Sequence, residues 1–163
     1  MVVWGVTAAW AVFIFELSGE TYSGSFTAWL LHQILHSLHV QLSATAFRTL
    51  HVFVRKLAHL TEYAIFSLFL YHSFEGRGEH RWRAHTAVGA IVVAGLYSLT
   101  DEFHQSLVRG RTSSLFDCAI DTAGAALGML ILYGHEKLFH TMANSNAAAR
   151  ASREEKANGV AGE

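Results

Sequence analysis

The side chains best suited to chemistry lie in two short stretches, 55–62 and 99–128, where acids and bases border apolar runs. The groups expected to transfer protons are His59, Glu62, Asp101, Glu102, His104 and Asp121, and those expected to bind substrate are Arg55, Lys56, Gln105, Arg109, Arg111 and Asp117. Ionisable groups at the ends of apolar segments are costly beside lipid and indicate a functional site. The two stretches are therefore the first candidates for a shared site.

One interpretation is a site for an anionic, phosphate-bearing lipid, acting as a binder or as an enzyme. Arg55, Arg109 and Arg111 would hold phosphate oxygens in bidentate fashion. His59 or His104 would act as acid or base, with a nearby carboxylate orienting the imidazole. No known catalytic motif accompanies these residues, so binding without turnover stays open.

Two other interpretations also stay open. A divalent metal, such as Zn²⁺, Mn²⁺ or Fe²⁺, would suit the ligand pairs His59-x-x-Glu62 and Asp101-x-x-His104 on facing helices. The third interpretation is a purely structural network of ion pairs that locks the helix ends, because charges near lipid need partners. The pairs expected in such a network are Arg55–Glu62, Arg109–Asp117 and Arg111–Asp101.

Helical spacing decides which of these side chains share a face. The three one-face sets are Arg55, His59 and Glu62; Asp101, His104 and Gln105; and Asp117, Asp121, Gly124 and Gly128. The last set has two aspartates at its N-terminal end and two glycines at its C-terminal end. We expect this face to contact a neighbouring helix, because the glycines let that helix approach closely. Gly89 and Gly95 are expected to allow a similar approach.

Composition indicates an integral membrane protein. Of the 163 residues, 52% are hydrophobic and only 15% are charged, whereas about a quarter of an average soluble domain is charged. A formal net charge of −1 gives no sign of nucleic-acid binding. The single cysteine, Cys118, lies in an apolar run and excludes a disulfide within the chain.

The elements that must position the site are four apolar helices in one domain, 1–143. Apolar runs predict spans at about 2–17, 56–74, 84–101 and 115–134, so the fold class is an all-α four-helix membrane bundle. Helical spacing with interleaved histidines predicts an additional interfacial amphipathic helix at 26–47, the histidines forming its wet face. The segment 144–163 has few core-forming residues and is expected to be a disordered tail.

Loop charge predicts the orientation. The loop after the second span carries Arg77, Arg81 and Arg83, and the C-terminal flank carries Lys137, Arg150, Arg153 and Lys156. The positive-inside rule places both in the cytoplasm, together with the N- and C-termini. The two candidate stretches then meet at the outer face, because consecutive spans run antiparallel. The positive-inside rule disfavours basic residues on the outer face, yet Arg55, Lys56, Arg109 and Arg111 are expected there. Their presence favours an anionic ligand.

Four motifs carry a resemblance to a known family. They are R-K-L-A-H-L-T-E-Y at 55–63, S-L-T-D-E-F-H-Q-S at 98–106, R-G-R at 109–111 and D-x3-D-x2-G-x3-G at 117–128. Together with the first span ending in Glu16, they resemble the VanZ-like family of small bacterial membrane proteins. One departure is Val108, where the family often has proline before Gly-Arg.

The family takes its name from a protein linked to resistance against the glycopeptide teicoplanin. The resemblance therefore implies a multi-pass protein of the bacterial cytoplasmic membrane, acting near the cell envelope. It supplies no reaction. The partners expected are membrane lipids or a lipid-linked envelope precursor, and the oligomeric state stays open.

Overall fold

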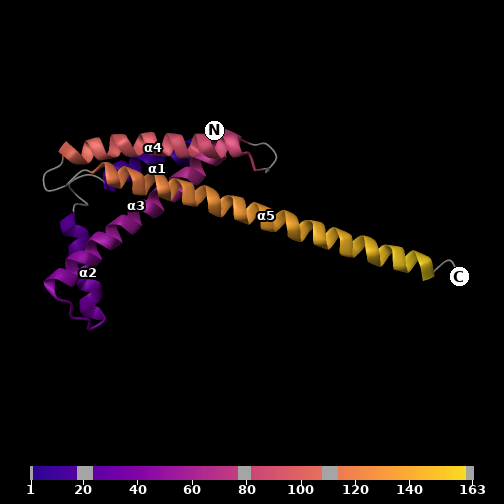
Figure 1. Ribbon diagram of the computed structural model, residues 1–163, viewed down its shortest axis with the longest axis horizontal. Coiled ribbons are helices and arrows are strands. Elements are labelled where there is room, and N and C mark those ends of the chain that lie inside the picture. The colour runs from indigo at the N-terminus through magenta and orange to yellow at the C-terminus, as the bar shows by residue number, and fades with distance from the viewer. Residues whose placement is uncertain (1, 18–23, 77–81, 108–113, 161–163) are drawn as a thin grey trace.

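The computed structural model describes residues 2–17, 24–76, 82–107 and 114–160, which form helices and connecting turns without a strand among them. In chain order the helices are α1 Val2–Leu17, α2 Gly24–Ser37, α3 Ala44–Glu75, α4 Ala84–Leu107 and α5 Leu115–Val160 (Figure 1). The predicted all-α class is confirmed.

Helix α3 is the centre of the packing. It contacts α1, α4 and α5, and its first part carries α2 away from the other helices (Figure 1). Helix α1 runs antiparallel to α3: Thr7 near its start lies 2.7 Å from Ser73 Oγ, and Trp10 Nε1 donates to the Glu62 carbonyl at 3.1 Å. Tyr97 of α4 donates to the Ala11 carbonyl at 2.7 Å, so α1 contacts both α3 and α4 at this level.

Two glycines of α5 let it cross α3 at backbone contact. A Cβ at Gly124 would overlap the Leu60 carbonyl oxygen, and one at Gly128 would lie 2.5 Å from the Ala64 oxygen. The predicted close approach of this stripe to a neighbouring helix is confirmed. The expectation for the third span holds at Gly95, which lies against Thr122 of α5, but it is wrong at Gly89, which faces open space.

Helix α4 separates small from large side chains on two faces. Its buried face carries Ala87, Ala90, Ala94 and Ser98, followed by Asp101 and Gln105 near the helix end. Its exposed stripe carries Val88, Val92, Leu96, Leu99 and Phe103. Small residues inside and large apolar residues outside are typical of helices packed within lipid.

Two described helices are long and apolar enough to cross a membrane, namely Ala84–Leu107 and Leu115–Ser145, and α1 is a shorter apolar helix. Helix α3, which contains the predicted second span at 56–74, is not among these helices. Spanning length and composition therefore support two of the four predicted spans.

The predicted interfacial helix at 26–47 is wrong in its extent. Helix α2 ends at Ser37, and the chain turns through His39, whose φ is 57°. Ser43 then caps α3 by accepting a hydrogen bond from the Ala46 amide at 3.2 Å. The second predicted span is the C-terminal part of this single 32-residue helix.

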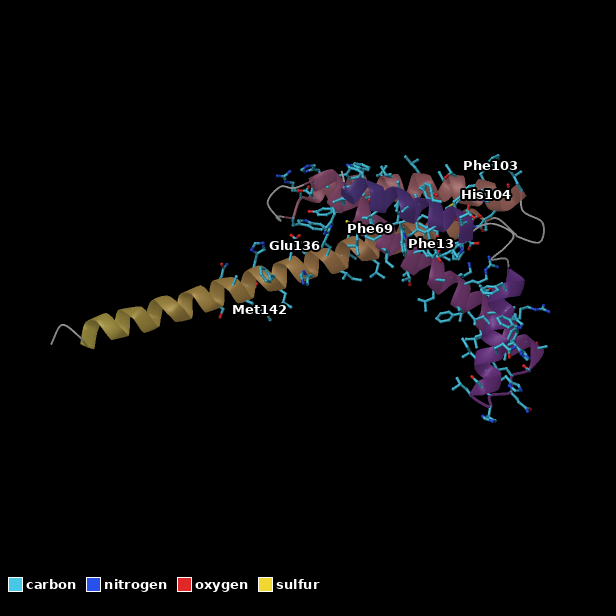
Figure 2. The ribbon with its side chains drawn as sticks, turned by 180° about the vertical axis from the view of Figure 1, so that it is seen from behind. Phe13, Phe69, Phe103, His104, Glu136 and Met142 are labelled. Atoms are coloured by element: carbon cyan, nitrogen blue, oxygen red, sulfur yellow. The ribbon has the colours of Figure 1, made fainter. Side chains whose placement is uncertain are left out.

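Helix α5 is longer than the predicted fourth span. It continues past residue 134 to Val160 and extends beyond the other helices, with Met142 on the extension (Figures 1 and 2). The disordered tail expected at 144–163 is thus helical up to residue 160. Its many Ala, Glu, Lys and Arg residues are strong helix formers, which accounts for the difference.

Candidate functional site

Side chains of α3, α4 and α5 enclose a cavity of about 170 Å³, which we call the bundle pocket. Its lining consists of Val52, Arg55, Lys56, His59, Gln105, Asp117, Ile120 and Asp121. Six of these are among the twelve predicted site residues. The structure therefore brings the two sequence stretches together at one end of the bundle, as the antiparallel order of the helices predicts.

Asp121 forms the floor of the bundle pocket. Its residue is fully buried, and its Oδ2 accepts a hydrogen bond from Ser98 Oγ at 2.6 Å. Its Oδ1 lies 3.4 Å from Nδ1 of His59, whose side chain is partly exposed. A buried carboxylate needs such partners, and the contact with His59 Nδ1 is electrostatic rather than a hydrogen bond.

Asp101 and Glu102 support the bundle pocket from α4. Gln105 Nε2 donates to Asp101 Oδ2 at 3.0 Å, and both residues are buried, so Asp101 positions the Gln105 amide at the lining. Glu102 Oε2 accepts from the Ser114 amide at 2.8 Å, directly before α5 begins. A carboxylate at a helix N-terminus is favourable, and it links the ends of α4 and α5.

Lys56 and Asp117 form an ion pair at the mouth of the bundle pocket. Lys56 Nζ lies 2.6 Å from Asp117 Oδ1, and the two side chains are 38% and 32% exposed. The ammonium also lies 5.0 Å from the centre of the Phe116 ring. The predicted pairs Arg109–Asp117 and Arg111–Asp101 involve residues that lie outside the described part of the chain.

Besides Asp101 and Glu102, two further predicted site residues do not line the bundle pocket. His104 stacks on Phe15 of α1, with ring centroids 4.1 Å apart and planes at 25°. Glu62 is half-buried beside α1, where its carbonyl accepts from Trp10. Both residues lie on the faces of α3 and α4 that contact α1. The prediction from helical spacing considered each helix alone and did not include contacts with α1.

The geometry of the described residues does not favour the metal interpretation. Among them, no group of three or more His, Cys, Asp and Glu side chains is arranged to hold a metal ion. His59 is paired with Asp121, whereas His104 is stacked on α1, so the two predicted ligand pairs do not converge.

Two buried polar residues of the site were not among the predicted ones. Ser98 binds Asp121, and Tyr63 is fully buried one turn after His59. The sequence signal was helical spacing: Ser98 lies three residues before Asp101, on the same face of α4.

Comparison with known proteins identifies the family. A sequence model of the VanZ/LLP1 family matches residues 3–140, which include every described residue of the bundle pocket. No curated protein matches the chain. No solved structure matches it either. Because the match covers most of its length, the chain belongs to the VanZ/LLP1 family.

Proposed function

We propose that the bundle pocket binds the anionic headgroup of a phosphate-bearing lipid or lipid-linked cell-envelope intermediate. One observation carries the proposal: Arg55, Lys56 and His59 line the same small pocket from adjacent positions on α3. Arg and Lys are the side chains that proteins use to bind phosphate, Arg through two parallel hydrogen bonds and Lys as a point charge.

The two carboxylates of the bundle pocket equal its Arg and Lys residues in number, but each carboxylate already has a partner other than Arg55. Asp121 lies beneath His59 and Ser98, and Asp117 is paired with Lys56. Among the described side chains, Arg55 is not in an ion pair, and it is half-buried at the lining. The Arg55 guanidinium is therefore the charged group of the pocket that is available to an anion.

Family membership and two apolar helices of spanning length indicate a membrane protein. The proposal extends this to four spans in the bacterial cytoplasmic membrane, with both termini in the cytoplasm and the bundle pocket outward. It is supported by the arginines of the loop before α4 and by the apolar exposed stripe of that helix. The bundle pocket would then open at the level of the outer headgroups.

The proposal includes conversion of the bound headgroup, with His59 as its acid–base group. Support comes from the contact between His59 Nδ1 and the buried Asp121, which places a carboxylate on the Nδ1 side and leaves Nε2 as the nitrogen for proton exchange. Gln105 of α4 adds an amide to the lining of the same pocket. A His59→Gln variant should bind lipid but release no product in an assay of lipid products by mass spectrometry.

Native mass spectrometry of the full-length detergent-solubilised protein tests the binding. We expect an anionic lipid to co-purify with the wild type and to be lost from the Arg55→Gln/Lys56→Gln double variant. The control is Arg83→Gln/Lys137→Gln, which removes two positive charges far from the bundle pocket. Lipid retained by the first variant, or lost equally from both, would contradict the proposal and favour the ion-pair network.

The proposal also covers a contribution to glycopeptide resistance, as the name of the family suggests. Susceptibility to teicoplanin is measured in a sensitive bacterial strain. The strain produces either the wild type or the Arg55→Gln/Lys56→Gln variant, at equal abundance in the membrane. We expect the wild type to raise the inhibitory concentration and Arg55→Gln/Lys56→Gln to abolish the increase. An increase that survives in the double variant would separate resistance from the bundle pocket.

A further inference from the structure

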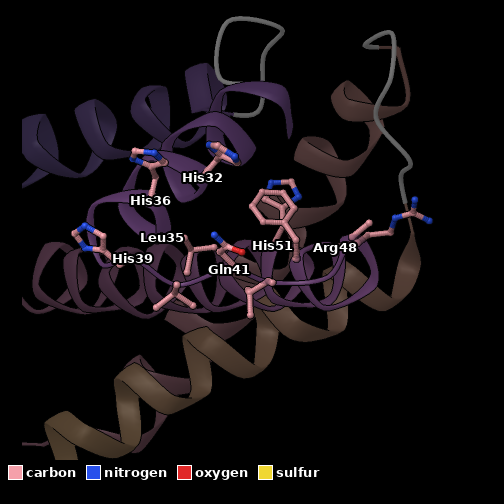
Figure 3. A pocket seen from close by; sticks show the side chains of 11 residues that line it. His32, Leu35, His36, His39, Gln41, Arg48 and His51 are labelled. Atoms are coloured by element: carbon pink, nitrogen blue, oxygen red, sulfur yellow. The ribbon is translucent and has the colours of Figure 1, made fainter.

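A second and larger cavity lies between α2 and the first turns of α3, outside the bundle pocket. We call it the hairpin pocket. Its volume is about 780 Å³, and Figure 3 shows the histidines and the arginine that border it. These basic residues are His32, His36, His39, Arg48 and His51. None of the described residues in its lining is Asp or Glu, so every ionisable group there is a base.

The histidines differ in their surroundings. His51 Nε2 lies 2.8 Å from Thr27 Oγ1 of α2, a contact that ties the two helices together. Burial and the charge of Arg55 lower the pKa of His51, so this residue keeps its neutral hydrogen-bonded form to more acidic pH. His32, His36 and His39 are exposed at the opposite wall.

The outer surface of the hairpin, which consists of α2 and the first turns of α3, is apolar. Trp29 is 56% exposed and Leu38 is 65% exposed, and Leu30 and Ile34 of α2 are exposed as well. An exposed apolar surface beside a basic polar surface is typical of segments that lie in the headgroup region of a bilayer. Charge complementarity then selects an anionic lipid as the occupant of the hairpin pocket.

We propose that the hairpin pocket binds the phosphate of an anionic membrane lipid at acidic pH and thereby docks the hairpin on the bilayer surface. Above neutral pH, Arg48 is the one permanent charge among the described lining residues. Histidine is the side chain whose charge ordinarily changes between about pH 5 and pH 8, and a cationic imidazole attracts a phosphate. Affinity therefore rises as the pH falls. The inference concerns different residues from the bundle pocket and does not depend on it.

Titration of the full-length protein in neutral detergent tests the proposal, with short-chain phosphatidylglycerol as the probe and calorimetry as the readout. We expect the dissociation constant at about pH 5.5 to be roughly tenfold to a hundredfold lower than at about pH 7.5, since each positive charge near an anionic lipid phosphate contributes. Short-chain phosphatidylcholine should show no such dependence. Inorganic phosphate that binds as tightly as phosphatidylglycerol would overturn the lipid assignment.

Two triple variants of His32, His36 and His39 make the result decisive. The Gln variant should lose the pH dependence, and the Arg variant should bind tightly at both pH values. The matched control replaces three exposed histidines elsewhere, His85, His135 and His140, with Gln and should behave as the wild type. A pH dependence that persists in the Gln variant, or disappears in the control, overturns the proposal.

The same titration separates this proposal from the one for the bundle pocket. Arg55→Gln/Lys56→Gln should retain the pH-dependent gain in affinity, because the three exposed histidines remain. Loss of that gain in this double variant would assign the effect to the bundle pocket and overturn the inference.

Discussion

Replacing Gly124 with alanine tests the packing that brings the site together. A Cβ at this position would overlap the Leu60 carbonyl oxygen and lie 2.9 Å from Leu60 Cα. These are backbone atoms of α3, so they cannot rotate away as a flexible side chain can. The helices must separate, and Asp121, one turn earlier on α5, would move away from His59.

The size of the effect follows from two opposing terms. Overpacking of this kind costs about 1–3 kcal/mol, whereas Ala in place of Gly gains roughly 1 kcal/mol of helix propensity. The net loss for Gly124→Ala is up to about 2 kcal/mol. For a chain of this length, that lowers the melting temperature by up to roughly 8 °C.

Thermal unfolding of the purified protein in detergent measures the loss, and Gly89→Ala is the matched control. Gly89 lies in the same kind of apolar helix, but a Cβ there would meet nothing within 4 Å. We expect its melting temperature to stay constant or rise. The reasoning is refuted if Gly124→Ala is as stable as the wild type, or if Gly89→Ala loses as much stability.

Three further predictions concern polar side chains of the site. Asp117→Asn should raise the affinity for anionic lipid, measured by titration with short-chain phosphatidylglycerol, because it releases the Lys56 ammonium from its ion pair. The loss of this exposed pair costs under about 1 kcal/mol of stability. Weaker binding would contradict this prediction. Ser98→Ala should lower the free energy of unfolding by about 1.5–3 kcal/mol, because Asp121 loses a buried hydrogen bond. The control is the exposed Ser106→Ala, which should change stability little, and equal losses would refute the assignment. His104→Phe should preserve both lipid binding and melting temperature, since the ring stacks on α1 outside the bundle pocket; lost binding would place it in the site.

The meeting of the two candidate stretches could be predicted because it depends on local pattern and connectivity alone. The acidic residues and glycines of 117–128 share one face of a helix. Because consecutive helices run antiparallel, the first turns of α5 lie beside the stretch of α3 that begins at Arg55. Lys56–Asp117 and His59–Asp121 are the contacts that result. The exact partner of each charge was not predictable, because it depends on how far each helix is rotated.

The differences arise where no strong local signal exists. The turn between α2 and α3 contains neither Pro nor Gly, and His39 adopts a positive φ that sequence pattern does not indicate for histidine. His104 and Gln105 are adjacent and equally polar, yet α1 covers one and leaves the other at the bundle pocket. The placement of α1 is a tertiary fact that the spacing within α4 does not contain.

The two proposed pockets share α3, and this has a geometric consequence. Arg48 lines the hairpin pocket and Arg55 lines the bundle pocket, seven residues apart on one continuous helix. At 1.5 Å per residue their backbones are separated by about 10 Å along the axis. The headgroup layer of one leaflet is roughly 5–8 Å deep, so a tilted α3 brings both arginines to that layer at once. Docking of the hairpin would thus fix the depth at which the bundle pocket meets lipid phosphates. Through this docking, pH would also affect lipid binding in the bundle pocket.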